Sequence, residues 1–173
     1  MPKNHRNYQK TRHIALSGLL FALAMALSFI EGTLVIPGLL PGMKLGLANI
    51  VTVFALYRLG AGAALAILVT RCLLGGLFAG NLSAMLFSVL GGVTAMLVMI
   101  LLQRLPRLSV YGVSLGGAAA HNVGQMAAAV ITLGSTMVLG YLPFLLAVSL
   151  ITGTLTGFVT ALLLRAAQHI RFR

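Results

Sequence analysis

Three polar side chains fall within five positions of a segment that is otherwise small and apolar. His121, Asn122 and Gln125 lie in GGAAAHNVGQMAAAVITLG, residues 116–134. An imidazole can transfer a proton or bind a metal, and carboxamides both donate and accept hydrogen bonds. A catalytic or metal-binding histidine needs acidic or further ligating residues, but the chain has no Asp, one Glu and one Cys. The three residues therefore indicate recognition of a ligand rather than catalysis.

Helical spacing places these side chains along one face. At about 100° per residue, His121 and Gln125 share a line that Ser114 and Thr132 approach within about 40°, and Asn122 flanks it. Polar groups that face lipid without a partner are costly, so this stripe is predicted to face the bundle interior or a cavity. We favour a ligand or permeation site. The alternative is hydrogen bonding between helices, which contributes on average below about 1 kcal/mol per bond.

Charged residues inside the apolar sequence point to the same kind of site. Arg71 falls near the middle of an apolar run, where a permanently charged guanidinium with five donors needs acceptors. Glu31, the only acid, is a candidate charge partner, although residue counting does not favour a common depth for the two. Lys44 lies nearer to Glu31 along the chain, and Asn49 follows it. Two cations against one acid leave a positive site, which suits a phosphate or carboxylate ligand.

The composition defines the class of protein. The 173 residues are 60% hydrophobic with a mean hydropathy of +1.05, which is too apolar for a soluble domain of this size, so an all-α polytopic membrane protein is expected. Its twelve Lys and Arg residues lie mostly at the ends of apolar runs, which indicates membrane orientation rather than nucleic-acid binding. The single Cys72 excludes an internal disulfide. Walker A, CxxC and HExxH motifs are absent, so no metal, cofactor or enzymatic activity is predicted.

Six apolar segments of membrane-spanning length are predicted, with both termini in the cytoplasm. They cover residues 13–30, 44–58, 60–79, 82–103, 109–133 and 141–165, between a basic segment 1–12 and a basic tail 166–173. Six spans place ten basic residues on one side: Lys3, Arg6, Lys10, Arg12, Arg58, Arg104, Arg107, Arg165, Arg171 and Arg173. The excess of Lys and Arg makes that side cytoplasmic.

The first segment and the stretch that follows it need separate interpretation. The basic start resembles a signal peptide, but its apolar run continues beyond the cleavage-like spacing, so an uncleaved first helix is expected. The stretch 32–42 contains Pro37 and Pro41 within apolar residues. Such a composition favours a partly inserted loop packed against protein, which would act as an outer lid.

Small residues repeat at four-residue spacing on two of the predicted helices. Gly18, Ala22 and Ala26 form such a stripe on the first segment, and Gly153 and Gly157 form a GxxxG step on the last. Small residues at this spacing let helix backbones approach closely in lipid. The spacing leaves open whether the first stripe faces a neighbour in this chain or a partner protein.

Four stretches carry a resemblance to a known bacterial family. They are PGMKLGLANIVTVFALYRLG (41–60), TRCLLGGLFAG (70–80), FSVLGGVTAML (87–97) and VSLGGAAAHNVGQMAAA (113–129). The chain resembles the Gx transporter family, often labelled heptaprenyl diphosphate synthase component I, which is similar to the S components of energy-coupling factor (ECF) transporters. The resemblance implies a six-helix protein of the bacterial cytoplasmic membrane that captures a small molecule outside. It also implies a partner transmembrane subunit and two ATPases, with docking on Gly18, Ala22 and Ala26.

The leading functional prediction is therefore the substrate-binding subunit of an uptake transporter for a vitamin- or cofactor-precursor-like compound. Lys44, Asn49, Arg71, His121, Asn122 and Gln125 would line its site. One alternative is the membrane anchor of a flavin- or quinone-linked electron-transfer complex. Another is an accessory component of heptaprenyl diphosphate synthase. The synthase reaction itself conflicts with the sequence, because prenyl diphosphate chemistry uses Asp-rich Mg²⁺ sites and the chain has no Asp.

Overall fold

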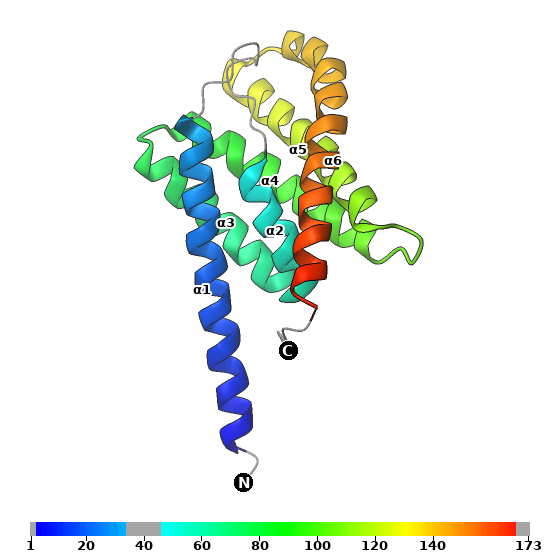
Figure 1. Ribbon diagram of the computed structural model, residues 1–173. Helices are drawn as coiled ribbons and strands as arrows, with labels where there is room; N and C mark the ends of the chain where they lie inside the picture. The colour runs from blue at the N-terminus through cyan, green and yellow to red at the C-terminus, as the bar shows by residue number, and fades with distance from the viewer. Residues whose placement is uncertain (1–2, 34–45, 169–173) are drawn as a thin grey trace.

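The computed structural model describes residues 3–33 and 46–168, and these are all helix and connecting turns. Side chains are described from Tyr8 onward. These residues form six α-helices and one short 3₁₀-helix, η1, and Figure 1 shows how the α-helices are arranged. Their bounds are α1 Lys3–Thr33, α2 Leu47–Arg58, α3 Ala61–Phe78, α4 Leu82–Gln103, α5 Val110–Leu133, η1 Thr136–Tyr141 and α6 Leu142–Ala166. The expected all-α class is confirmed for the described part of the chain.

The short helix α2 occupies the centre of the bundle. It contacts α1, α3 and α6, while α4 lies between α3 and α5, and α5 packs against α6. Residues from Ile50 to Leu56 are all buried, so α2 is enclosed on every side, as an all-round apolar helix requires. The start of α1 and the end of α6 point toward the same end of the molecule (Figure 1).

The helix ends lie close to the predicted segment ends except at α1. This helix begins at Lys3 rather than near residue 13 and has 31 residues, about 46 Å at 1.5 Å per residue. The reason is local, because residues 3–17 contain neither Gly nor Pro to stop a helix. A hydrocarbon core of about 30 Å leaves the basic start of α1 outside it. The predicted segment 1–12 is therefore a helical extension of the first span over its described residues.

Four helical segments of the described chain are long and apolar enough to cross a membrane. They are Tyr8–Thr33, Ala61–Phe78, Leu82–Gln103 and Thr136–Ala166. With 12 residues, α2 is short for a span, and the polar residues of α5 lower its hydropathy. The chain is membrane-associated, with much apolar surface on the outside. On α1, for example, Ile14, Leu19 and Phe29 are all exposed.

Glycines allow the closest helix crossings. A Cβ added at Gly124 of α5 would lie 2.6 Å from the Leu90 carbonyl oxygen and 2.9 Å from the Gly91 Cα of α4. On α6, a Cβ added at Gly153 would lie 2.9 Å from the Leu115 Cα of α5. The predicted GxxxG step on α6 thus packs inside the chain. Backbones this close replace the hydrophobic drive that lipid does not supply.

At the end of the bundle where α6 terminates, two side chains join helices through main-chain carbonyls. Arg58 at the end of α2 donates to the Leu164 and Ala167 carbonyls of α6. His13 Nε2 of α1 lies 3.3 Å from the Leu59 carbonyl oxygen. A cation beside the carbonyls of a helix C-terminus is favoured by the helix dipole. These contacts fix α1, α2 and α6 relative to one another.

Replacing Gly124 with Ala is expected to lower the thermal stability of the protein in detergent. The added methyl group meets backbone that cannot rotate away, and such overpacking costs about 1–3 kcal/mol. Gly75→Ala in α3 is the matched control, because nothing lies within 4 Å of a Cβ at that position. Equal melting temperatures for the two variants would contradict the close α4–α5 crossing.

Candidate functional site

A cluster of polar side chains joins α1, α2 and α3. The Arg71 guanidinium of α3 donates from Nη1 to Ser28 Oγ of α1 at 2.9 Å. It also donates from Nη2 to Asn49 Oδ1 of α2 at 3.4 Å. Arg71, which the sequence placed inside an apolar run, is thus held by two neutral oxygen acceptors on two other helices. Asn49, a predicted site residue, lies beside it.

Glu31 belongs to the same cluster but is held by backbone. It is 8% exposed, and its Oε1 accepts a hydrogen bond from the Gly46 amide at 2.5 Å. Gly46 precedes α2 with φ +84°, in the left-handed region that glycine adopts freely. Its carbonyl accepts a hydrogen bond from the main-chain amide of Asn49 at 2.9 Å. Ser28 and Glu31 are one turn apart on α1. The hydrogen bonds therefore run from Glu31 through Gly46, Asn49 and Arg71 to Ser28.

The suggested Glu31–Arg71 pair takes a different form from a direct salt bridge. Within the described part of the chain the two side chains make no ion pair. Arg71 nevertheless bonds Ser28 directly, and Glu31 lies one helical turn from Ser28 on α1. Residue counting did not favour a common depth. The contact with Ser28 places the Arg71 side chain within about one helical turn of Glu31. The charges are close enough to influence one site while each keeps separate hydrogen-bond partners.

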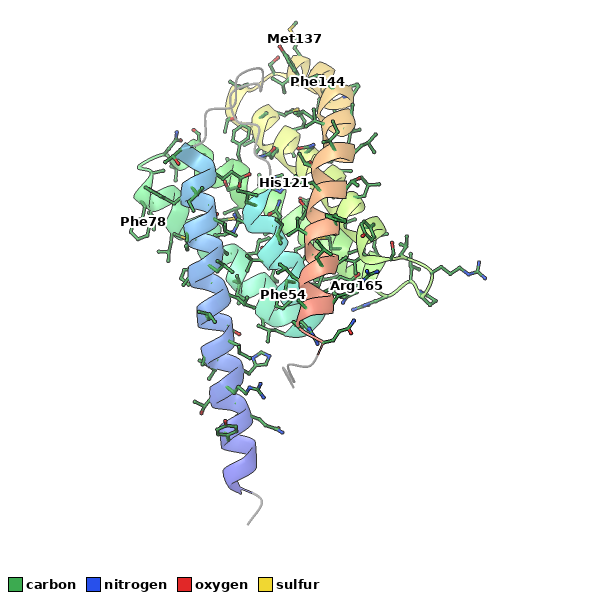
Figure 2. The ribbon with its side chains drawn as sticks, in the orientation of Figure 1. Phe54, Phe78, His121, Met137, Phe144 and Arg165 are labelled. Carbon is green, nitrogen blue, oxygen red and sulfur yellow. The ribbon has the colours of Figure 1, made fainter. Side chains whose placement is uncertain are left out.

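His121 and Gln125 face the inside of the bundle from α5. A Cβ added at Gly91 of α4 would lie 3.0 Å from His121 Cε1 and 2.9 Å from Gln125 Cγ, so both side chains pack on that glycine. Gly124 and Ala118, three residues to either side of His121, lie about 60° from it in opposite directions. Gly124 meets α4, and Ala118 meets Gly153 of α6. His121 therefore points between α4 and α6, toward the middle of the view in Figure 2.

The α5 residues lie close to the level of Arg71 along the bundle. Cys72, the neighbour of Arg71, donates from Sγ to the Ser88 carbonyl of α4 at 3.4 Å. Ser88 is three residues before Gly91, the glycine against which His121 packs. One turn of α4, about 5 Å, separates the two contacts. Both groups of polar residues thus occupy the same section of the bundle.

The remaining members of the predicted stripe have other positions. Asn122 donates from Nδ2 to the Leu145 carbonyl of α6 at 2.7 Å, which is the interhelical hydrogen bond kept above as an alternative. Ser114 is buried at 3% exposure. Thr132 is exposed and bonds the Ala128 and Ala129 carbonyls of its own helix, so the prediction that it faces the interior is wrong. Thr132 lies in the last turn of α5, beyond the part of the helix that packs against its neighbours.

Some predicted features lie outside the described residues, and others gain a definite position. Lys44 and residues 34–42 of the predicted lid lie outside the described residues. Gly18, Ala22 and Ala26 are exposed, and a Cβ at Gly18 would meet nothing within 4 Å, so this stripe does not pack within the described chain. Across residues 3–33 and 46–168, no three His, Cys, Asp or Glu side chains are placed to hold a metal ion.

Sequence reasoning missed one hydroxyl residue of the cluster and another that lies beside it. Ser28 is the partner of Arg71. Thr156 of α6 reaches the start of α2, where its Oγ1 would lie 3.4 Å from a Cβ at Gly46. Ser28 and Gly32 are four residues apart in the sequence, as are Thr152 and Thr156. This spacing gave no distinctive signal that either hydroxyl residue belongs to a site. Only the position of Ser28 one turn before the single acid could have indicated it.

Comparison with known proteins identifies the family. The chain matches the family described as heptaprenyl diphosphate synthase component I over residues 20–163, and it belongs to that family. The matched region includes Arg71, Asn49 and all of α5. No curated protein and no solved structure matches the chain.

Asn122→Ala is expected to destabilise the contact between α5 and α6. Interhelical hydrogen bonds in membranes contribute on average about 0.6 and at most about 1.7 kcal/mol, so a loss of this size should appear in unfolding measurements in detergent. The control is Thr132→Ala on the same helix, whose hydroxyl bonds only its own helix. A loss of stability for Thr132→Ala as large as that for Asn122→Ala would contradict the assignment.

Proposed function

We propose that this chain is the substrate-binding membrane subunit of a small-molecule uptake transporter of the ECF type. The observation that carries the proposal is the polar cluster of Ser28, Glu31, Asn49 and Arg71, which three otherwise apolar helices hold together. Isolated interhelical bonds need one donor and one acceptor, whereas this cluster gathers both charge signs at one place. Intramembrane ionisable residues of this kind mark substrate pathways.

His121 and Gln125 complete the proposed site from α5. They lie within about one turn of the Arg71 level along α4 and point inward. A carboxamide can donate hydrogen bonds to a ligand and accept them from it. An imidazole nitrogen can donate or accept a hydrogen bond according to its protonation. The ligand would be a vitamin- or cofactor-precursor-like compound.

The proposed topology has six spans with both termini in the cytoplasm of a bacterium. Its support is the distribution of Lys and Arg, together with the start of α1 and the end of α6, which point toward the same end of the molecule (Figure 1). Although α2 is short, it is enclosed by α1, α3 and α6, so protein rather than lipid covers its ends. In this arrangement α5 crosses with its polar face turned inward, as the lipid environment requires.

Single cysteines introduced into a Cys72→Ser background test this topology. Cysteines at Tyr8 and Gln168 are expected to be protected from a membrane-impermeant maleimide in intact cells. Cysteines at Asn81 and Met137 are expected to react, because both residues are exposed and the proposed spans 60–79, 82–103, 109–133 and 141–165 leave them in outer connections. Labelling of Gln168 but not Tyr8 from outside would mean an odd number of spans and would overturn the proposal.

A protein partner is part of the proposal. The family description speaks of a component, and this chain lacks a nucleotide-binding motif, so energy for transport must come from other subunits. We place the partner against the exposed stripe of Gly18, Ala22 and Ala26, with an ECF-type transmembrane subunit and two ATPases as the energising unit. The chain itself is proposed to have no enzymatic activity, because it has no Asp and one Glu for diphosphate chemistry.

Native mass spectrometry of the gently solubilised protein tests the function. The wild-type protein is expected to retain a small molecule, and His121→Ala is expected to reduce its occupancy at least about tenfold, the loss of one hydrogen bond to a charged or polar ligand. Val123→Ala, on the outward side of the same helix, is the matched control. Retention of a flavin or quinone instead would favour the electron-transfer anchor. Higher product yield on coexpression with a prenyltransferase would favour the accessory role.

A further inference from the structure

Arg71 has more hydrogen-bond donors than the described protein satisfies. A guanidinium carries five N–H groups, of which one bonds Ser28 and one bonds Asn49. Its Nε is buried and has no hydrogen-bond partner among the described residues. Both acceptors are neutral, and the Nη2 to Asn49 Oδ1 distance of 3.4 Å is long for a hydrogen bond. The guanidinium is therefore positioned but not saturated.

Its charge is also not matched by a direct partner. The only acid of the chain, Glu31, bonds the Gly46 amide and makes no ion pair with Arg71 within the described residues. A buried or part-buried cation is stable only when it is paired and hydrogen-bonded. Among the described residues, the groups that Arg71 bonds directly are the Asn49 carboxamide of α2 and the Ser28 hydroxyl of α1. The protein thus supplies dipoles where the guanidinium needs an anion.

We infer that Arg71 binds an oxyanion, either a carboxylate or a phosphate group, as the recognised part of the ligand. This inference rests on the proposed function, because it names the class of molecule that the same site takes. The planar fork of a guanidinium matches two oxygens of a carboxylate or phosphate, which also supply the negative charge that an uncharged group lacks. The long bond to Asn49 is the contact that the anion replaces. Ser28 keeps the guanidinium oriented while this exchange takes place.

The variant Asn49→Asp supplies the anion from the protein itself. Its carboxylate replaces a carboxamide oxygen already 3.4 Å from Nη2 and pairs with Arg71 without a change in side-chain size. We expect this variant to melt at a higher temperature than wild type and to lose its response to added anions. The control is Asn81→Asp, the same chemical change at the exposed N-cap of α4, where Asp caps a helix as well as Asn does.

The probes are inorganic phosphate and acetate, each titrated against purified protein in neutral detergent and compared with chloride at equal ionic strength. Both are expected to raise the melting temperature of wild type and of Asn81→Asp. Arg71→Gln should weaken phosphate binding about ten- to hundredfold, the loss of charge-assisted bonds. Should Arg71→Gln fail to fold, Asn49→Asp still decides the question. No stabilisation beyond chloride in wild type, or an equal response in Asn49→Asp, would overturn the inference.

The oxyanion can belong to a soluble molecule or to a lipid headgroup, and two arms of the experiment separate these sources. Nanodiscs of phosphatidylcholine alone are compared with nanodiscs that also contain phosphatidylglycerol. Stabilisation by phosphatidylglycerol that depends on Arg71 and removes the phosphate response identifies a headgroup, whereas a phosphate response equal in both membranes identifies a soluble ligand. Either result supports the oxyanion class.

The outcome is separable from that of the proposed function. The protein could bind anions through Arg71 but retain no small molecule and support no uptake. This result would uphold the oxyanion site and contradict the proposed transporter function. A retained neutral compound, with no response to phosphate or acetate, would uphold the transporter and overturn the oxyanion site.

Discussion

The permanent charge of Arg71 is the constraint around which the described helices are arranged. A guanidinium cannot neutralise itself by losing a proton, so the bundle must surround it with acceptors. Ser28 of α1 and Asn49 of α2 do so, and both bonds cross between helices. The same residue that threatens the stability of α3 in lipid therefore sets the relative positions of α1, α2 and α3.

The short central helix depends on this arrangement. Because α2 is only 12 residues long, the groups at its two ends are held by contacts with other helices. Its beginning is tied to α1 through Gly46 and Glu31. Its end is tied to α6 through Arg58 and to α1 through His13 and the Leu59 carbonyl. Polar contacts at both ends hold this short apolar helix in place, and its residues from Ile50 to Leu56 are buried.

Periodicity and composition were sufficient for most of the helices, because each consists of a long apolar run ended by Gly, Pro or charge. The inward position of His121 and Gln125 followed from helical angle alone, since lipid forbids the opposite orientation. Asn122 and Thr132 could not be assigned in this way. Whether a flanking carboxamide meets a ligand or the Leu145 carbonyl depends on how α6 crosses α5, and crossing is decided by glycines on both helices. Ser28 was missed because a single serine in an apolar helix is ordinary until its partner on another helix is known.

The two arginines of the helical core show how the partner distinguishes a structural cation from a binding cation. Arg58 meets the carbonyls at the C-terminal end of α6, where the negative end of the helix dipole compensates its charge. The contact closes the bundle at that end. Among the described residues, Arg71 bonds side-chain oxygens of two neutral residues, which orient a guanidinium without cancelling its charge. A protein that needed Arg71 for packing alone would be better served by an apolar residue of similar volume, because a buried charge rarely gains stability over such a residue. The oxyanion proposed above would supply the missing charge, and this would explain the position of Arg71 among apolar neighbours.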